Sequence, residues 1–355
     1  MSRIEISGLS VAYGQQPVLH DIDLDVPDGT VLTLLGASGS GKTTLLRTVA
    51  GFLDPSAGSV RAGDRMLVEA SRRSVPPEQR NLAMVFQHHA VWPHLSVLDN
   101  VTYPLRRRKV PRAQRAARIE HALEVVGLSD LATRRPETLS GGQRQRVALA
   151  RAIVARPEAL LLDEALSALD EPLRAALRLT LRQLVDQEGM TIIQVTHDRD
   201  EALALADRIA VLDGGRLAQV GTPAELVDAP GSAAVAIFLH DATVVSGTVG
   251  PDGAFHGADG ALSLPTEVLA TPAGRVRGQA QLALLPQGLR VCAPGQGTGP
   301  SGTVQATLYG RVETTVVIQW LGHQVRALTD AARPVVPSVG DEVGVRVLHA
   351  AVYPG

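Results

Sequence analysis

Eight residues in the first part of the chain, GASGSGKT from Gly36 to Thr43, have the types and spacing that hold phosphate groups in proteins. The glycines allow backbone N–H groups to turn inward around phosphate oxygens. Lys42 supplies a positive charge for the β- and γ-phosphates, and the Thr43 hydroxyl can ligate Mg²⁺. We therefore predict a nucleotide-binding loop made of these residues and the next one along the chain: Gly36, Ala37, Ser38, Gly39, Ser40, Gly41, Lys42, Thr43 and Thr44.

Two acidic residues, Asp163 and Glu164, end the apolar run ALLLDE (159–164). Taken alone, such a pair is typical of a solvated loop start. Paired with a phosphate loop, it indicates a catalytic site, because Asp163 could hold Mg²⁺ through water while Glu164 orients and deprotonates an attacking water. Glu164 is therefore our candidate general base.

Two further polar residues, Gln87 and His197, end the apolar runs LAMVF and TIIQVT. Each on its own could be an ordinary polar strand terminus. At the sheet edge that carries the phosphate loop, Gln87 could reach the metal or the attacking water, and His197 could bond on the γ-phosphate side. The candidate catalytic residues are then Glu164, His197, Lys42 and Gln87, and the candidate metal ligands are Thr43, Gln87 and Asp163.

An aromatic residue, Tyr13, precedes a glycine in VAYGQQPVL, on an early strand. Its ring could stack on an adenine base, since stacking requires only an aromatic face. On physical grounds alone, a half-buried strand tyrosine explains it better.

The elements that would position these residues alternate between strands and helices. Apolar runs predict buried strands at residues 30–36, 81–87, 159–164 and 191–197. A helix is predicted from Lys42, with Gly51 as its C-cap. This alternation favours a mostly parallel sheet covered on both faces, to which RIAVLDGGRLAQVG (208–221) adds a hairpin turning at Gly214 and Gly215.

Two segments depart from this pattern. Residues 88–157 are arginine-rich and helical in period, which predicts a helical insert between two strands of the sheet. After about His240, short alternating runs such as residues 302–320 predict a small β-barrel domain, with two barrel-like halves as an option. We expect one domain at 1–240, with its helical subdomain at about 88–157, and a second at 241–355.

Composition excludes several classes of protein. A chain of 355 residues with 45% hydrophobic and 20% charged residues can build two folded cores. Its net charge of -2 gives no reason to expect a nucleic-acid partner. A single cysteine, Cys292, excludes an intrachain disulfide and fits a reducing cytosol. The start MSRIEISGLS lacks the apolar core of a secretion signal, and no run of about 18 apolar residues occurs, so we expect any membrane role to come through a partner.

The motifs together resemble those of ABC transporter ATPase subunits, in order and rough spacing, over residues 3–237. The most diagnostic piece is LSGGQ, which opens LSGGQRQRVALARA (139–152). The other matching pieces are Tyr13, GASGSGKT, Gln87, LLLDE, SALD (167–170) and His197. The C-terminal extension resembles the regulatory domain of importer ATPases of the iron(III), polyamine, sulfate and maltose group. The resemblance implies an α/β P-loop NTPase core with a helical subdomain, followed by a small all-β (OB/TOBE-like) domain.

The resemblance also implies ATP and Mg²⁺ as cofactors and a head-to-tail homodimer. ATP bound at Gly36–Thr43 of one subunit would be covered by a segment of the second ATPase subunit, namely Ser140, Gly141, Gly142 and Gln143. Physical chemistry agrees, because Ser140 can cap the helix that starts here and the helix N-terminus would face the γ-phosphate. Asp170 of SALD would lie at the same seam.

The remaining partners follow from the same resemblance. Transmembrane permease subunits would meet the segment HHAVWPHLSVLDNV (88–101), coupled to the nucleotide through Gln87, and would hold the chain at the cytoplasmic face of the membrane. An extracytoplasmic substrate-binding protein would act indirectly. For the transported solute we expect an inorganic ion such as iron(III), with polyamine or sulfate as alternatives. The C-terminal domain would bind a regulatory ligand or protein, or extend the dimer interface.

Two positions depart from the family pattern. Ala37 and Ala165 stand where proline is usual, and Ala165 frees Glu164 from the extended conformation that a following proline imposes. We expect hydrolysis to survive, because no catalytic side chain is lost.

Other classes fit less well. A DNA-repair or chromosome-type ATPase would need long coiled coils or zinc cysteines between Gln87 and Ser140, where the heptads are missing and no cysteine occurs. A small-molecule kinase leaves LSGGQ unexplained, and a translation-type protein normally carries two cassettes.

Overall fold

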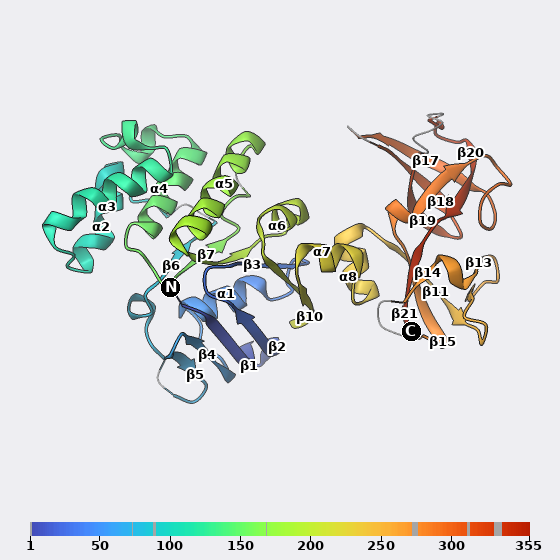
Figure 1. The fold of residues 1–355 in the computed structure, drawn as a ribbon, viewed down its shortest axis with the longest axis horizontal. Helices are drawn as coiled ribbons and strands as arrows, with labels where there is room; N and C mark the ends of the chain where they lie inside the picture. The colour runs from blue at the N-terminus through green and yellow to red at the C-terminus, as the bar shows by residue number, and fades with distance from the viewer. Residues whose placement is uncertain are drawn as a thin grey trace. The chain divides into compact units, whose positions relative to one another are not determined.

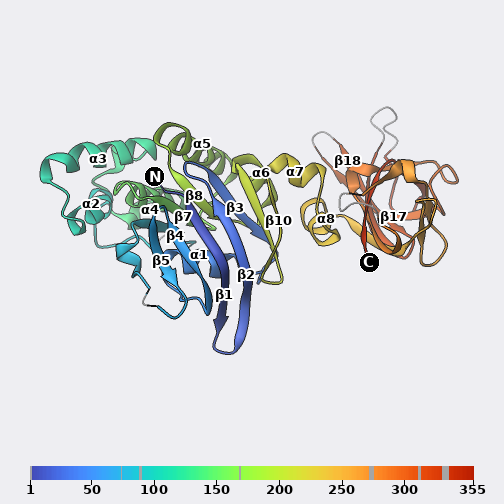
Figure 2. The same ribbon diagram turned by 60° about the horizontal axis from the view of Figure 1, so that its bottom comes forward.

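The computed structural model describes residues 2–72, 74–87, 90–167, 169–271, 276–310, 313–329 and 336–355. Residues 88 and 89 of the expected permease-facing segment, residue 168 of SALD, and residues 311 and 312 of the run 302–320 lie outside these ranges. The chain forms two compact units, Met1–Pro223 and Ala224–Gly355. Figures 1 and 2 show the secondary structure of each.

A six-stranded sheet forms the centre of the first unit, in the order β10-β9-β3-β8-β7-β6. Its strands are β3 (Val31–Gly36), β6 (Leu82–Val85), β7 (Ala159–Asp163), β8 (Thr191–Val195), β9 (Arg208–Asp213) and β10 (Arg216–Gly221). All neighbours are parallel except β9 and β10, which form the expected hairpin. The predicted mostly parallel sheet is thus confirmed.

Alternate side chains of this sheet enter two different cores. In β7, for example, Leu160 and Leu162 pack with helices α4 (Gly141–Ile153) and α5 (Glu171–Glu188), whereas Leu161 packs on the opposite face. Both faces are covered, which is why the strand sequences are continuously apolar and not alternating.

The opposite face is covered by helix α1 (Lys42–Ala50) and by a second, antiparallel sheet, in the order β2-β1-β4-β5. Its strands are β1 (Ile4–Tyr13), β2 (Gln16–Val26), β4 (Ala57–Ala62) and β5 (Arg65–Glu69), and the 3₁₀ helix η1 (Pro77–Gln79) follows them. Sequence periodicity did not predict this sheet.

A buried cation, Arg80, anchors the C-terminal end of α1. Its Nη1 donates to the carbonyl oxygens of Thr48 and Val49 at 2.8 and 2.9 Å, and its Nε donates to Val75 O at 2.8 Å. Burial lowers the Arg80 pKa to about 10, so the group remains charged at neutral pH. A cation at this end complements the helix dipole. The helix then ends at Gly51, whose φ of 92° is left-handed, as the C-cap prediction requires.

A helical subdomain lies between β6 and β7 in the sequence, as predicted. It contains α2 (Val97–Arg107), α3 (Arg112–Val125) and α4, with the 3₁₀ turns η2 (Ser129–Leu131) and η3 (Pro136–Thr138). Figures 1 and 2 show the three helices grouped at one end of the unit. A further short helix, α6 (Arg199–Leu205), follows β8.

The second unit combines a six-stranded sheet, in the order β13-β12-β11-β15-β21-β14, with a closed barrel, β16-β19-β18-β17-β20. The sheet strands are β11 (Thr243–Val249), β12 (Phe255–Gly257), β13 (Ser263–Leu264), β14 (Leu269–Ala270), β15 (Gly278–Leu284) and β21 (Ala350–Pro354). The barrel strands are β16 (Leu289–Cys292), β17 (Gly302–Tyr309), β18 (Thr314–Trp320), β19 (His323–Leu328) and β20 (Glu342–Val347). The turns η4 (Thr266–Val268) and η5 (Pro286–Gly288) lie between them. The all-β character of this region was predicted correctly.

The two units divide at Pro223 and Ala224 rather than near His240. The helices α7 (Pro223–Asp228) and α8 (Ala233–His240) cause this difference. Ala233 and Ala236 of α8 pack with residues of β15 and β21, so the helix shares a core with the β-rich unit. A helical period alone does not reveal which core receives its apolar face.

We expect Arg80→Met to lower the free energy of unfolding of the first unit by about 3 kcal/mol, because buried carbonyl groups lose their donors. Urea unfolding followed by circular dichroism measures this change. Arg72→Met is the control, since Arg72 forms only an exposed pair with Glu69. A difference under about 0.5 kcal/mol between the two variants would contradict the anchoring role.

Candidate functional site

The phosphate loop lies between β3 and α1, where the sequence predicts it. Gly36, Gly39 and Gly41 have φ of 154°, 81° and 99°. A Cβ on Gly36 would lie 2.3 Å from Leu212 O, and one on Gly41 would lie 2.5 Å from Leu19 Cδ2. These two positions therefore require glycine for close packing as well as for conformation.

The loop borders a cavity of about 570 Å³. Its lining combines residues from separate parts of the sequence: Val18, Ser38, Gly39, Gly41, Lys42, Thr43, Thr44, Glu164 and His197. Strand order explains this convergence, because β3, β8 and β7 are neighbours and the segments after them leave the sheet at one edge.

Lys42 is the buried cation of this loop. Its Nζ donates to the carbonyl oxygens of Gly36 and Ala37, each at 2.8 Å. Burial lowers the Lys42 pKa, and the nearby Glu164 carboxylate opposes that effect. The ammonium group of Lys42 is thus held by the carbonyl groups of its own loop. Ala37 itself is exposed to solvent.

Thr43 and Asp163 form the second polar contact. The Thr43 hydroxyl donates to Asp163 Oδ1 at 3.1 Å, and Arg47 approaches Asp163 Oδ2 at 3.6 Å. Burial raises the Asp163 pKa, whereas Thr43 and Arg47 lower it. A hydroxyl and a buried carboxylate are hard oxygen donors, and this set fits Mg²⁺. Ser40 Oγ nearby is buried without a hydrogen-bond partner among the described residues.

Gln87 and His197 both meet Glu164. Gln87 Nε2 donates to Glu164 Oε2 at 2.9 Å, and His197 Nδ1 lies 3.4 Å from Glu164 Oε1. Two residues that are far apart in the sequence therefore contact the carboxylate of a third. The arrangement fixes the direction of that carboxylate at the cavity wall.

The backbone of Glu164 is left-handed, with φ of 48°. Its N–H donates to Val195 O at 3.0 Å, and its carbonyl accepts from Ser167 Oγ at 2.8 Å. A proline in the next position would disfavour helical backbone conformations at Glu164. Ala165 imposes no such restriction.

Other predicted residues lie outside the cavity lining. Tyr13 ends β1 with half of its surface exposed, 50%, so an aromatic face is accessible there. Ser140, Gly141, Gly142 and Gln143 begin α4, and Asp170 caps α5 by accepting from Leu173 N at 3.1 Å. None of these six residues lines the cavity.

The two glycines of LSGGQ, Gly141 and Gly142, differ in what surrounds them. Ser140 and Gln143 form a reciprocal capping box, which fixes the start of α4. A Cβ on Gly142 would lie 2.2 Å from Leu173 Cδ2, so packing within the chain explains this glycine. A Cβ on Gly141 would meet nothing within 4 Å. Packing within the chain therefore gives no reason for glycine at position 141.

Sequence reasoning missed Arg174, which connects two predicted segments. Its Nη2 donates to Leu169 O at 3.0 Å, and its Nη1 bonds Asp198 Oδ2 at 3.1 Å. It thereby ties the segment of Asp170 to the segment of His197. The available sequence signal was the position of Arg174, one helical turn after Asp170 in α5.

Glu201 was also missed. It is buried in α6 and follows His197 closely in the sequence. Its carboxylate accepts hydrogen bonds from Gln194 Nε2 and Thr196 Oγ1. Burial raises its pKa to about 7, and Asp198 adds to the effect. Its position in the first turn of α6, after the capping Asp198, is that of an ordinary exposed acid at a helix start.

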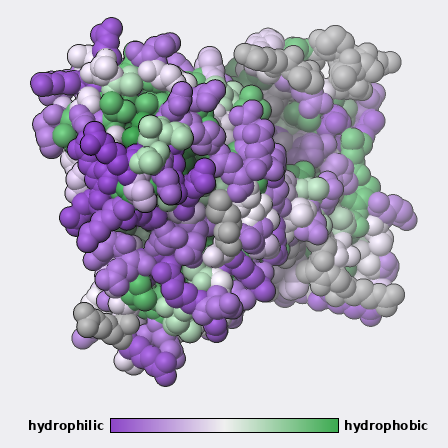
Figure 3. All heavy atoms as spheres, turned by 60° about the vertical axis from the view of Figure 1, so that its left-hand side comes forward, coloured by the Kyte–Doolittle hydropathy of each residue, from purple (hydrophilic) through white to green (hydrophobic). Residues whose placement is uncertain are grey.

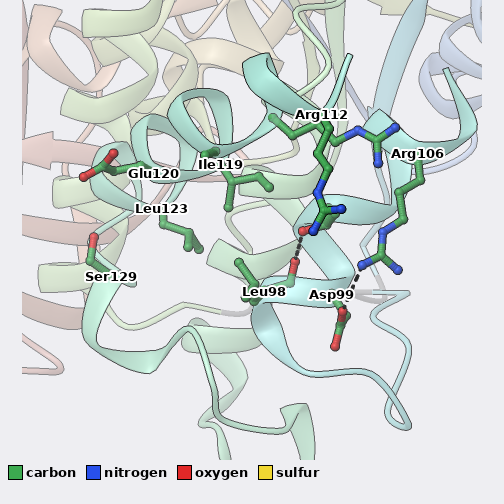
Figure 4. A pocket seen from close by; sticks show the side chains of 11 residues that line it. Leu98, Asp99, Arg106, Arg112, Ile119, Glu120, Leu123 and Ser129 are labelled. Carbon is green, nitrogen blue, oxygen red and sulfur yellow. Dashed lines mark hydrogen bonds and ion pairs between the residues drawn. The ribbon is translucent and has the colours of Figure 1, made fainter. Parts of the chain in front are cut away.

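A second cavity of about 570 Å³ lies between α2 and α3 in the helical subdomain. Figure 4 shows Leu98, Ile119 and Leu123 in its middle, with Arg106 and Arg112 at one end and Glu120 and Ser129 at the other. Figure 3 brings this side of the molecule forward and shows small hydrophobic patches among hydrophilic side chains. We call this cavity the α2–α3 groove.

Trp92, which precedes α2 in the chain, packs against α2 and α4. The rings of Trp92 and Tyr103 are 4.6 Å apart, and the Arg151 guanidinium lies 4.5 Å from the Trp92 ring centroid. Asn100 accepts from Trp92 N at 3.0 Å and donates to Trp92 O at 3.1 Å. These contacts hold Trp92 in one position.

Together, the phosphate loop and the carboxylates at one sheet edge define a nucleotide-binding protein of the α/β class. Residues 19–167 match the family model described as ABC transporter. Among solved structures, cbiO1 from Clostridium perfringens, part of an ABC transporter complex, is 28% identical with a TM-score of 0.59 over 63% of this chain and 90% of that one. The dimeric cassette MJ0796 bound to ADP and Pi is 28% identical with a TM-score of 0.56, covering 62% and 98%.

Similar curated proteins are import subunits. The spermidine/putrescine import ATP-binding protein of Marinobacter nauticus is 41% identical over 309 residues, covering 85% of this chain and 80% of the relative. The trehalose/maltose protein of Thermococcus litoralis is 45% identical over 240 residues, covering 67% and 64%. The sulfate/thiosulfate protein of Mycobacterium bovis is 46% identical over 246 residues, covering 69% of each chain.

The chain therefore belongs to the ABC transporter family, as an ATP-hydrolysing subunit of the importer type with a C-terminal regulatory domain. No helix in the described parts of the chain combines the length and hydropathy needed to cross a membrane.

Proposed function

We propose that this subunit hydrolyses Mg²⁺-bound ATP at the cavity beside Gly36–Thr43, with Glu164 as the general base. The observation that carries this proposal is the contact of Glu164 with both Gln87, at 2.9 Å, and His197, at 3.4 Å. A carboxylate held from two sides can orient a water for in-line attack on the γ-phosphate.

The other residues stabilise charge and hold the nucleotide. Lys42 would leave the loop carbonyls for the β- and γ-phosphates, and loop N–H groups would bind the remaining oxygens. Thr43, Asp163 and Gln87 would hold Mg²⁺, which neutralises phosphate charge when bound. His197 would hydrogen-bond on the γ-phosphate side, and Tyr13 would stack on adenine.

We further propose that two copies assemble head to tail, so that Ser140–Gln143 of one covers the nucleotide of the other. Two observations support this. The segment does not line the cavity of its own chain, and the open space at Gly141 admits another molecule to the helix N-terminus. The solved cassette MJ0796 is described as dimeric. Asp170, exposed at the start of α5, would lie at the same interface.

Glu164→Gln should lower hydrolysis by the assembled transporter by about a hundredfold or more, because the base is lost while an amide can still bond Gln87. ATP should then hold the two copies together, which size-exclusion chromatography with ATP detects as a stable dimer. Glu124→Gln, an exposed change on α3, is the control. A Glu164→Gln protein that hydrolyses ATP normally or never dimerises would refute the assignment.

Gly141→Ala and Ser140→Ala should leave nucleotide binding by the monomer intact and abolish dimer closure and hydrolysis. The first adds a methyl group where this chain has free space, and the second removes a helix cap worth about 1 kcal/mol.

Ser232→Ala removes an equivalent cap, that of α8, and should leave hydrolysis unchanged. Fluorescent nucleotide binding and phosphate release measure the two steps separately. Retained hydrolysis in both LSGGQ variants would rule out this role of the segment.

We also propose that the α2–α3 groove receives a cytoplasmic helix of the permease. One end of the apolar floor carries Arg106 and Arg112, and Asp99 pairs with Arg106 there at 3.7 Å. This excess of positive charge suits an amphipathic helix that carries an acidic residue.

Helix α2, which lines the groove, also contacts Trp92 through Tyr103 and Asn100. Because Trp92 follows Gln87 closely in the sequence, docking and the Glu164 contact would be coupled. This docking would hold the subunit at the cytoplasmic face of the membrane.

Leu98→Glu should weaken copurification with the permease about tenfold or more, since it places a charge in the apolar floor. Leu98 is 40% exposed, so the fold should tolerate the change. Leu179→Glu, at 67% exposure on α5, is the matched control. Equal loss of permease binding in both variants, or in neither, would contradict docking at the groove.

The transported solute follows from the relatives only as a proposal. The three curated proteins above are named for polyamines, trehalose or maltose, and sulfate or thiosulfate, and polyamine or sulfate is our choice among these. Iron(III) stays a prediction from sequence. Stimulation of hydrolysis by each solute, in membranes containing the permease and its extracytoplasmic binding protein, distinguishes them.

A further inference from the structure

A third cavity, of about 870 Å³, lies in the C-terminal unit on the outer side of strands β16 and β20. Val345 and Val347 of β20 are buried in the core of the unit, whereas Arg346 between them is exposed. Because alternate residues of a strand point to opposite faces, Arg346 lies on the outer surface, where the cavity is.

Two arginines meet at this cavity. Arg290 of β16 and Arg346 of β20 both line it, and they are direct partners in the antiparallel register. Cβ atoms in such a pair are only about 5 Å apart, and like charges directly opposite each other are destabilising. Two cations at these positions therefore lower the stability of this strand pair.

Neither arginine is neutralised by a carboxylate in the described part of the chain. Arg290 Nη1 donates to the carbonyl oxygens of Gln287 and Leu289 at 2.8 and 3.0 Å. Arg346 Nη2 has only a long contact with Gln296 O at 3.5 Å. Each guanidinium group has further N–H donors for a ligand, because it carries five in total.

Two acids line the same cavity, away from the arginine pair. Glu342 is four residues from Arg346 on β20, about 13 Å along the strand. Asp341 precedes it and accepts from Ser338 N at 2.8 Å. The cavity is therefore positive at one end and negative at the other.

We propose that the Arg290–Arg346 pair is a binding site for a small free oxyanion, of the sulfate or phosphate type. One doubly charged anion between the two guanidinium groups would remove their repulsion and accept several charge-assisted hydrogen bonds. The acidic end of the cavity limits the anion to the arginine end. This site is separate from the residues assigned above to ATP.

Cys292 provides a local readout. It is the single cysteine of the chain and lines the same cavity. Burial raises the pKa of its thiol, and Arg346 lowers it. An anion on Arg346 would cancel this second effect, which leaves less thiolate at a given pH and slows alkylation.

The experiment measures alkylation of Cys292 by iodoacetamide, a neutral reagent that does not compete for the arginines. Potassium sulfate or phosphate is titrated against potassium chloride at constant ionic strength. We expect saturable slowing by sulfate or phosphate and none by chloride. A rise of about one in the pKa of the thiol would slow the reaction by up to about tenfold.

Arg290→Gln and Arg346→Gln should abolish the slowing. Arg326→Gln should keep it, because Arg326 pairs with Asp241 instead. Lys42→Ala should also keep it, which separates this site from the phosphate loop.

Equilibrium dialysis with labelled sulfate gives a second measurement. The wild-type chain should bind one sulfate more than the Arg290→Gln/Arg346→Gln double variant. An equal count, or slowing that survives in both single variants, would overturn the proposal. Protection that rises with protein concentration in the absence of added anion would instead assign the arginines to an acidic group of a second copy, and would also overturn it.

Discussion

The proposed nucleotide site depends on how closely the loop from Gly36 to Thr43 packs against the end of strand β9. Gly36 leaves no room for a Cβ beside Leu212 O, at 2.3 Å, and Gly41 is pressed against Leu19 of β2. The loop is therefore held between two strands before any ligand arrives. Its backbone N–H groups are preorganised, and preorganised dipoles stabilise developing charge without the cost of rearrangement. Arg80 extends this constraint to the far end of α1, whose last carbonyl groups it binds.

The second constraint is the order of the strands. β3, β8 and β7 are neighbours, so residues that follow them in the chain gather at one edge: Lys42 and Thr43, then His197, then Asp163 and Glu164. Gln87 joins them from β6, the strand beyond β7. Glu164 is where these contributions meet, and its left-handed backbone directs the carboxylate toward Gln87 and His197. Arg174 adds a link in the same region, because it binds Leu169 O on one side and Asp198 on the other.

Sequence was sufficient for the parallel sheet, for the position of GASGSGKT between a strand and a helix, and for the all-β extension, for identifiable reasons. Strands buried on both faces are continuously apolar, and the loop needs glycine, lysine and threonine at fixed spacing. The sheet of β1, β2, β4 and β5 was missed because its strands have bulges that disturb alternation. Arg80, Arg174 and Glu201 were missed for another reason. A charge that the fold buries fully or partly resembles a surface charge in sequence, and only the fold shows which polar groups face it. The boundary at Pro223 was missed because the apolar sequence of α8 does not show which of the two cores the helix packs against.

The two glycines of LSGGQ show how far a single chain can explain its own sequence. A Cβ on Gly142 would lie 2.2 Å from Leu173 Cδ2, so a side chain there would require Leu173 to move. A Cβ on Gly141, one residue away on the same helix turn, would meet no atom of the described residues within 4 Å. In a helix interior, glycine costs about 1 kcal/mol relative to alanine, and Gly141 and Gly142 occupy the first two positions of α4, where the same preference acts more weakly. At Gly142 packing offsets the cost, whereas at Gly141 no packing contact among the described residues does. Under the proposed head-to-tail assembly, a nucleotide held by a second copy, with its phosphate facing the N-terminus of α4, has the charge and size to supply the compensating interaction.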